Sequence, residues 1–256
     1  MSDAADFSPG AWWFVDQTFG RWMDVRIRAI RSLLPSAAGL PHGPLLFVPN
    51  HTSFWDGFII RRIQKRLRPN TPLYTIMLEE ELERRPFLRK LGGMGIRPGD
   101  PRSFRAVVNE LSRRLETQPD ACVAFFPQGR IWPSFRRPLG FLPGVGTLVR
   151  RIPVLNVLPT GLHLEGHNRT GLTAYVAVGG PVPGPDSAPD WVRTLERAVE
   201  AEIDGILDHV SLHGEEGPTR WPPGKATSEQ APERSPSGSE SPDTHRGSVD
   251  ATAPHY

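Results

Sequence analysis

The chain has 256 residues, of which 38% are hydrophobic, so it is long enough to bury the core of one sizeable globular domain. Its formal net charge is +2, but residues 213–256 carry seven acidic and four basic side chains, which leaves the preceding part near +5. That moderately basic part suits an anionic partner such as a membrane surface, a phosphorylated ligand or nucleic acid, while the single cysteine, Cys122, excludes a disulfide within the chain.

The first predicted element is an amphipathic helix over residues 11–34. Its bulky apolar side chains precede most of its basic ones: Trp12, Trp13, Phe14, Phe19, Trp22 and Met23, then Arg21, Arg26, Arg28 and Arg31. Tryptophan favours the headgroup boundary of a bilayer and arginine favours anionic lipid. We expect residues 1–40 to form a helical membrane-surface segment, and a helix packed on its own domain is the equal alternative.

Strand and helix patterns alternate between residues 41 and 212. Strands are expected at 45–48, 73–77, 93–96, 122–126, 154–159 and 172–178. Helices are expected at 55–67, 79–91, 101–118 and 191–212, with Asp100 and Asp190 as N-caps. This alternation predicts an α/β domain with a mostly parallel sheet flanked by helices, in which ligands bind beyond Val48, Ile96 and Phe126, at the carboxyl ends of strands.

Residues 213–256 are rich in Ser, Pro, Gly, Glu and Asp and contain almost no aliphatic side chains. Such a segment cannot bury enough apolar surface to offset the entropy of ordering. We therefore expect a disordered C-terminal tail.

A histidine and an aspartate lie five positions apart where the first predicted strand gives way to a helix. A tight turn can fold Asp56 back towards His51. A carboxylate on one imidazole nitrogen fixes the tautomer, leaves the other nitrogen free to take a proton, and stabilises the imidazolium that results. The alternative is a structural one, in which His51 caps the helix and Asp56 merely favours its N-terminus.

The surrounding residues Asn50, His51, Ser53 and Asp56 match, position by position, the pattern Asn-His-x-Ser-x-x-Asp. That block resembles the glycerolipid acyltransferase family, whose bacterial members acylate lysophosphatidate. The resemblance implies direct transfer of an acyl group from acyl-CoA or an acyl carrier protein, used as co-substrate with no other cofactor. It also implies that His51 is the general base, that Asp56 orients it, and that Asn50 and Ser53 lie at the substrate.

Three further blocks of that family have counterparts in the expected order. Its Phe-Pro-Glu-Gly-Thr-Arg block resembles Phe126, Pro127, Gln128, Gly129, Arg130 and Ile131, and so differs at the last two positions and at the glutamate. Its strand ending in Ile-x-Arg resembles Gly95–Pro98, with Arg97 one position early. Its apolar strand ending in proline, beside the acyl-donor pocket, resembles 157–161 and contains Pro159.

The resemblance makes Phe126, Pro127, Gln128, Gly129, Arg130, Arg97 and Pro159 the remaining candidates for substrate binding. Gly129 allows close backbone approach and Arg130 can pair with an anion. Two alternatives follow from the shifted arginines. Either Arg97, Arg102, Arg130, Arg136 and Arg137 rebuild a phosphate site, or the acceptor is a lipid or glycolipid hydroxyl without phosphate.

Other kinds of site have weaker support. His163, Glu165 and His167 lack the further ligand that a zinc site needs, so we expect no metal. A GxSxG nucleophile elbow is absent from the sequence. The basic run Arg61, Arg62, Lys65, Arg66 and Arg68 fits the exposed face of one helix, so we expect no nucleic-acid partner.

We thus expect an acyltransferase at the cytoplasmic face of the cell membrane, held there peripherally by its N-terminal helix, with membrane lipids as acceptors. Backbone N–H groups near Gly129 or after His51 are the expected oxyanion donors. The rival interpretation is a lipid-binding member of the fold that has lost catalysis, which the changes at Gln128 and Ile131 suggest.

Overall fold

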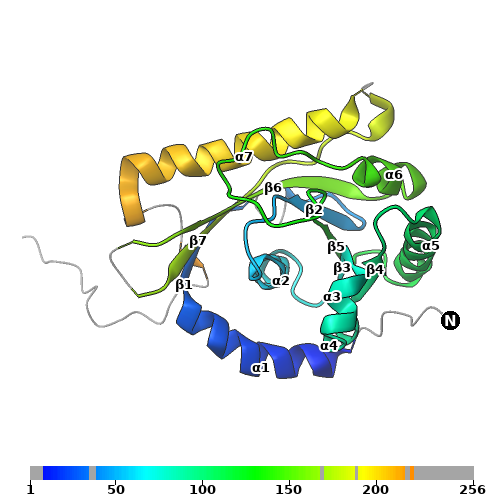
Figure 1. Ribbon diagram of the computed structural model, residues 1–256, viewed down its shortest axis with the longest axis horizontal. Helices are drawn as coiled ribbons and strands as arrows, with labels where there is room; N and C mark the ends of the chain where they lie inside the picture. The colour runs from blue at the N-terminus through cyan, green and yellow to red at the C-terminus, as the bar shows by residue number, and fades with distance from the viewer. Residues whose placement is uncertain (1–7, 35–38, 168–169, 188–189, 217–219, 222–256) are drawn as a thin grey trace, which may run out of the picture. The chain divides into compact units, whose positions relative to one another are not determined.

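The structure is a computed structural model that describes residues 8–34, 39–167, 170–187, 190–216 and 220–221. The elements below belong to one unit, Met1–Pro223. Figure 1 shows a twisted sheet with helices on both faces.

Eight strands form this sheet, in the order β4-β3-β5-β2-β6-β7-β1-β8. They are β1 (Ile27–Leu33), β2 (Leu45–Pro49), β3 (Leu73–Leu78), β4 (Gly93–Ile96), β5 (Cys122–Phe125), β6 (Asn156–Glu165), β7 (Leu172–Val178) and β8 (Arg220–Trp221). All neighbours are parallel except β6 with β7 and β1 with β8. The predicted α/β fold with a mostly parallel sheet is therefore confirmed.

Helices cover the two faces of the sheet. They are α1 (Pro9–Arg26), α2 (Asp56–Leu67), α3 (Glu79–Arg84), α4 (Phe87–Lys90), α5 (Pro101–Thr117), α6 (Gly144–Arg151) and α7 (Trp191–His213), with 3₁₀ turns η2 (Pro185–Ser187) and η3 (Gly214–Glu216). Side chains of α5, α6 and α7 share one core cluster with the sheet, and those of α1 and α2 share another.

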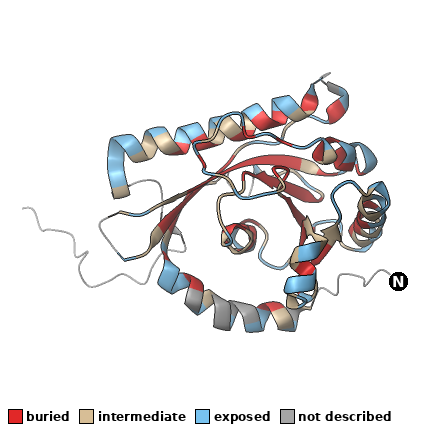
Figure 2. Ribbon diagram, viewed as in Figure 1, coloured by how far each residue is buried: buried red, intermediate tan, exposed pale blue. Residues whose placement is uncertain are grey.

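Strand β2 shows how the sheet separates these two cores. Leu46 and Val48 pack on the side of α5 to α7, whereas Leu45 and Phe47 pack on the side of α2. Successive strand residues point to opposite faces, and all four are fully buried. A strand buried on both faces is typically a nearly continuous apolar run. Figure 2 shows the central strands of the sheet in red, as buried.

The N-terminal segment differs from the predicted helix over 11–34, which is wrong beyond Arg26. Residues Ile27–Leu33 form strand β1, which pairs in parallel with β7. Ile27 and Ile30 are buried there. The pairing also covers the edge of the apolar strand β7, whose backbone N–H and C=O groups would otherwise be unpaired. In α1 itself Trp12 is buried while Trp13 and Phe14 are exposed.

Other predicted boundaries also shift. The helix expected at 79–91 is two short helices, because Pro86 lacks an N–H group and the residue before it leaves the helical region. The strand expected at 154–159 extends to Glu165, where it pairs with β7. Helix α6 and strand β8 were not predicted. Asp100 accepts from the Arg102 N–H as expected, whereas Asp190 precedes α7 without a side-chain cap bond.

The basic run on α2 does not form one exposed face, which corrects that prediction. Lys65 and Arg66 are exposed, but Arg61 is buried and its guanidinium carbon lies 4.5 Å from the centre of the Trp12 ring. Arg62 pairs with Asp24 at 2.6 Å, and Arg68 donates to the carbonyl oxygens of residues 41 and 43. Most of these cations therefore hold the helix to its surroundings.

The predicted tail starts at a residue that still belongs to α7. After His213 come η3 and then β8, which pairs antiparallel with β1. Residues 217–219 and 222–256 lie outside the described part of the chain. Among the described residues, no helix is both long enough and apolar enough to cross a bilayer.

Candidate active site

The candidate site lies where the parallel strands β2 and β5 end, beside the middle of β6. The chain leaves β2 at Pro49, turns through residues 50–55 and enters α2 at Asp56. The segment after β5 starts at Phe126, at the same edge of the sheet, because β2 and β5 are parallel neighbours. The topology therefore brings together the two best-matched sequence blocks.

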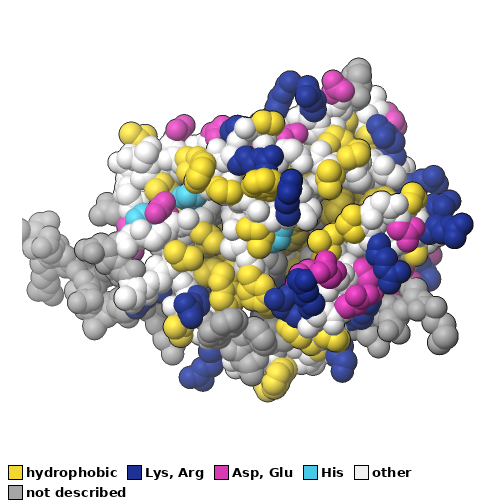
Figure 3. Space-filling view, viewed as in Figure 1, with side chains coloured by type: hydrophobic (Ala, Val, Ile, Leu, Met, Phe, Trp, Pro, Cys, Tyr) yellow, Lys and Arg dark blue, Asp and Glu magenta, His cyan; other side chains and the backbone are white. Residues whose placement is uncertain are grey.

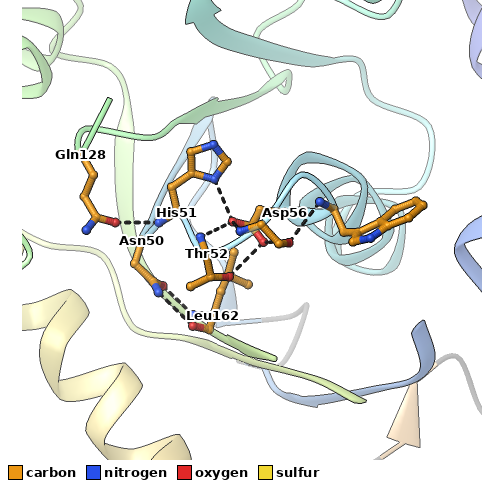
Figure 4. Close-up of polar contacts among 8 residues, drawn as sticks. Asn50, His51, Thr52, Asp56, Gln128 and Leu162 are labelled. Atoms are coloured by element: carbon orange, nitrogen blue, oxygen red, sulfur yellow. Dashed lines mark hydrogen bonds and ion pairs between the residues drawn. The ribbon is translucent and has the colours of Figure 1, made fainter. Parts of the chain in front are cut away.

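His51 and Asp56 are in hydrogen-bond contact. The Nδ1 atom of His51 lies 2.8 Å from Oδ2 of Asp56, whose side chain is fully buried. An ionised carboxylate can only accept, so Nδ1 carries the ring proton and Nε2 is the unprotonated nitrogen. The Nε2 atom faces away from Asp56 (Figure 4), and the histidine side chain is 25% exposed.

Four more hydrogen bonds fix Asp56. Its Oδ2 accepts from the backbone N–H groups of Thr52 and Ser53, at 2.5 and 2.9 Å. Its Oδ1 accepts from the hydroxyls of the same two residues, at 3.1 and 2.6 Å. The Asp56 carboxylate thus holds the turn in place and orients the His51 ring. Ser53 contributes by binding and positioning Asp56. Thr52, which sequence reasoning missed, does the same.

Asn50 fastens the turn to β6. Its side-chain amide donates to the Leu162 carbonyl at 2.9 Å and accepts from the Leu162 N–H at 2.7 Å. Asn50 is 1% exposed and follows Pro49, the last β2 residue paired with β6. The amide therefore continues the ladder by one step, which places Asn50 in a structural role beside His51.

The backbone of His51 is held by the segment after β5. Its N–H donates to Oε1 of Gln128 at 2.7 Å, and its carbonyl accepts from the Trp132 N–H at 2.8 Å. Gln128 is buried and also donates from Nε2 to the Leu139 carbonyl at 3.0 Å. The Gln128 side chain thus both accepts and donates a hydrogen bond. An amide can do both, whereas the carboxylate found at this position in the glycerolipid acyltransferase family can only accept.

Residues 126–142, here called the crossing loop, are fixed in turn by α7. Glu200 accepts from the Leu139 N–H at 3.1 Å and Glu196 from the Gly140 N–H at 2.5 Å. Arg137 pairs with Asp204 one turn further along α7. These acids hold the loop that holds His51, and no sequence motif signalled them.

Phe126, Pro127 and Gly129 complete the turn beside the histidine. The ring centroids of Phe126 and His51 are 4.7 Å apart. Gly129 has φ = +66°, a conformation that favours glycine, and the Pro127 carbonyl accepts from the Leu142 N–H. Phe126 therefore lies against the imidazole, whereas Pro127 and Gly129 shape the loop.

Three of the backbone N–H groups near the expected oxyanion position are already engaged. The N–H groups of Thr52 and Ser53 bind Asp56, and the Gly129 N–H binds the Phe126 carbonyl at 3.1 Å. The Gly129 N–H itself is therefore not available as an oxyanion donor. Within the described ranges, the next N–H groups, of Arg130 and Ile131, donate no hydrogen bond.

The five arginines expected to rebuild an anion site do not converge. Arg137 is neutralised by Asp204, and Arg97 lies 3.7 Å from Glu83. Arg130 and Arg136 place their guanidinium carbons 4.4 and 3.5 Å from the centre of the Trp132 ring. Arg102 is exposed at the start of α5. Of the three arginines in the crossing loop, Arg130 and Arg136 lie against Trp132, whereas Arg137 is bound to Asp204.

Pro159 lies within β6, paired with Val48 of β2, and is buried. No hydrogen bond or ion pair among the described residues joins Pro159 or Arg97 to the His51–Asp56 pair. The structure thus brings together Asn50, His51, Ser53, Asp56, Phe126 and Gln128, but leaves Pro159 and Arg97 outside this network.

A second histidine network fastens the crossing loop to β6. Ser134 Oγ lies 2.7 Å from Nδ1 of His163, and Nε2 of His163 lies 3.2 Å from Glu165. Ser134 and His163 are both buried, and burial lowers the pKa of His163 although Glu165 opposes this shift. Because it is buried, we assign this cluster a structural role. The described residues contain no group of three or more His, Cys, Asp or Glu placed to hold a metal.

Gln128→Glu tests the double role of Gln128. The introduced carboxylate can accept from the His51 N–H, but its other oxygen faces the Leu139 carbonyl in a buried site. We expect the free energy of unfolding to fall by about 1–3 kcal/mol at pH 7. The crowded carboxyl has a raised pKa in the folded state, so protonation restores the donor and the deficit shrinks as the pH falls.

Urea unfolding at pH 7 and pH 5 measures both effects. Gln118→Glu is the matched control, because Gln118 Oε1 only accepts, from the Tyr74 hydroxyl, and a carboxylate keeps that role. An unfolding free energy of Gln128→Glu equal to that of the control at both pH values would refute the donor role of Gln128.

A comparison with protein families places most of this site within a known family. A family model described as Acyltransferase matches residues 30–162, just over half of the chain. The match runs from β1 to the Asn50 partner Leu162 and includes the whole His51 network, but not α7. No curated protein matches the chain.

Proposed function

Because the chain belongs to the acyltransferase family, we propose that it transfers a fatty acyl group from an acyl thioester to a hydroxyl of a lysophospholipid or a related glycerol-phosphate lipid. The donor is acyl-CoA or an acylated carrier protein. His51 is the general base and Asp56 orients it. No acyl-enzyme forms, because the thioester is already activated.

The proposed reaction proceeds in two steps at Nε2 of His51. Nε2 takes the proton of the acceptor hydroxyl while the hydroxyl oxygen attacks the thioester carbonyl, giving a tetrahedral oxyanion. The carbon–sulfur bond then breaks, and the thiolate that leaves takes the proton from His51. The Asp56 carboxylate, 2.8 Å from Nδ1, stabilises the imidazolium between the two steps.

The oxyanion needs hydrogen-bond donors that are not otherwise engaged. The N–H groups of Arg130 and Ile131 meet that condition within the described chain, and both precede Trp132, whose own N–H binds the His51 carbonyl. We therefore propose these two amides for the oxyanion in place of Gly129. Each preorganised donor of this kind typically contributes about 10²- to 10³-fold in rate.

Charged and apolar side chains support the proposed acceptor and location. Arg130 and Arg136, both against Trp132, suit a headgroup phosphate. The exposed Trp13 and Phe14 of α1 suit peripheral attachment to the cytoplasmic face of the cell membrane. A lipid hydroxyl without phosphate remains the second candidate, because Ile131 stands where the resembling family has arginine.

One observation carries the proposal: a part-exposed imidazole whose Nδ1 is bound to a fully buried carboxylate, so that its other nitrogen is a base open to substrate. A buried structural histidine would offer no such nitrogen. The same feature favours an enzyme over a lipid-binding relative that has lost catalysis, because in such a relative nothing requires His51 to stay oriented.

Thiol release tests the proposal. Purified protein is incubated with palmitoyl-CoA or palmitoyl carrier protein and a panel of lysophosphatidate, lysophosphatidylglycerol, monoacylglycerol and a glycolipid. We expect free thiol to appear with at least one phosphorylated acceptor, together with an equal amount of diacylated product by mass spectrometry.

The other outcomes of the same assay are informative. Product from monoacylglycerol or glycolipid alone would favour the second candidate. Thiol release without acylated lipid would indicate hydrolysis. Lipid binding by calorimetry without thiol release from either donor, with every acceptor, would contradict the proposed function and support the non-catalytic alternative.

A further inference from the structure

The crossing loop combines arginines with large apolar side chains. Its 17 residues, Phe126 to Leu142, contain three arginines and no acidic residue. They also include seven large apolar side chains: Phe126, Ile131, Trp132, Phe135, Leu139, Phe141 and Leu142. Arginine interleaved with aromatic and aliphatic residues is typical of segments that lie in the interface of a bilayer.

Three of those apolar side chains point to solvent. Phe135 is 73% exposed, Leu142 56% and Ile131 52%, whereas Leu139 and Phe141 are buried and anchor the loop. Phe54, in the His51 turn, is exposed as well. Figure 3 shows hydrophobic and basic side chains next to each other over the area that the loop crosses in Figure 1. Such a cluster loses contact with water only when something covers it.

The charges beside this patch are positive: Arg130 is exposed, whereas Arg136 is half-buried and its Nη1 atom is buried without a hydrogen-bond partner. Arg137 is paired with Asp204, but Arg130 and Arg136 form no ion pair in the described part of the chain and lie against Trp132. Two unpaired guanidinium groups among exposed apolar side chains suit a surface that is both anionic and apolar. A bilayer containing anionic lipid has both properties.

We propose that the crossing loop docks on an anionic bilayer, with Ile131, Phe135 and Leu142 inserted at the headgroup boundary and Arg130 and Arg136 against lipid phosphates. The same loop binds both backbone groups of His51, so docking places the His51 site at the membrane. This contact is separate from the one proposed for α1 and goes beyond the proposed function, because docking requires no acyl transfer.

A bilayer fits this patch better than an acidic carrier protein does. An acidic carrier protein would match the arginines by charge, but a bilayer also offers an apolar interior for Phe135, the most exposed of the loop's large apolar side chains. The loop is also held in place by hydrogen bonds to Glu196, Glu200 and His163. Its insertion into a bilayer would therefore cost little conformational entropy.

Vesicle sedimentation of the full chain tests the inference, with phosphatidylcholine vesicles that contain or lack phosphatidylglycerol. We expect Phe135→Ser and Ile131→Ser each to weaken binding to the anionic vesicles by about ten-fold, as partial burial of one large apolar side chain implies. Arg130→Gln should cost about five-fold on anionic vesicles and little on neutral ones. Unchanged thermal unfolding shows that each variant is folded.

Two exposed apolar residues outside the loop provide matched controls, Val154→Ser and Leu212→Ser, at 60% and 78% exposure. They should change binding by less than about two-fold. Wild-type binding by both loop variants, with loss only in Trp13→Ser on α1, would overturn the inference in favour of α1 alone. Intact vesicle binding with a raised KM for an acylated carrier protein would overturn it in favour of a protein partner.

Discussion

Replacing His51 with alanine is expected to lower kcat by roughly 10³- to 10⁴-fold while the protein stays folded. The substitution removes the only ring nitrogen that the proposed mechanism uses as a base. The fold should persist because the His51 contacts with Gln128 and Trp132 are made by its backbone. Asp56 keeps four of its five donors.

Single-turnover thiol release with the best acceptor of the lysolipid panel measures this effect, and circular dichroism checks the fold. His42→Ala is the matched control, because His42 is exposed in the turn before β2 and should leave the rate unchanged. Normal acyl transfer by folded His51→Ala protein would remove the basis of the proposed mechanism.

Most of the framework around this histidine could be predicted from the sequence. Apolar runs such as Leu45–Val48 and Cys122–Phe125 are buried on both faces, so strands there can be predicted without knowing their exact neighbours. The helix start at Asp100 is equally local, because Asp100 and Pro101 suffice to begin a helix. The His51–Asp56 contact was predictable for the same reason, as a turn of five residues can close it.

The elements that sequence reasoning missed depend on distant partners. Ile27–Leu33 contains residues that a helix tolerates, and it is a strand because β7 offers an edge to pair with. Gln128 could be matched to a motif, but its two bonds involve backbone groups of His51 and Leu139, which no residue type reveals. Glu196 and Glu200 belong to a helix outside the matched family region and likewise bind backbone.

Asp56→Ala is expected to affect both stability and turnover. Five donors converge on the buried carboxylate, and they lose their acceptor together. We expect the free energy of unfolding to fall by about 3–5 kcal/mol, with turnover reduced at least as far as in His51→Ala. Urea unfolding and single-turnover rates measure the two effects, and Asp24→Ala, which breaks the more exposed Arg62 pair, is the control for stability.

Asp56→Asn separates orientation from charge. Oδ2 accepts from two backbone N–H groups that cannot turn away, whereas Oδ1 accepts from two hydroxyls that can rotate to accept. The asparagine oxygen must therefore take the Oδ2 position, where it still receives the His51 Nδ1 proton and keeps the tautomer. Only the charge that stabilises the imidazolium is lost, so kcat should fall by about 10²-fold, well short of the loss in Asp56→Ala. Equal rates for the two variants would mean that the charge of Asp56, and not its geometry, carries its whole effect on His51.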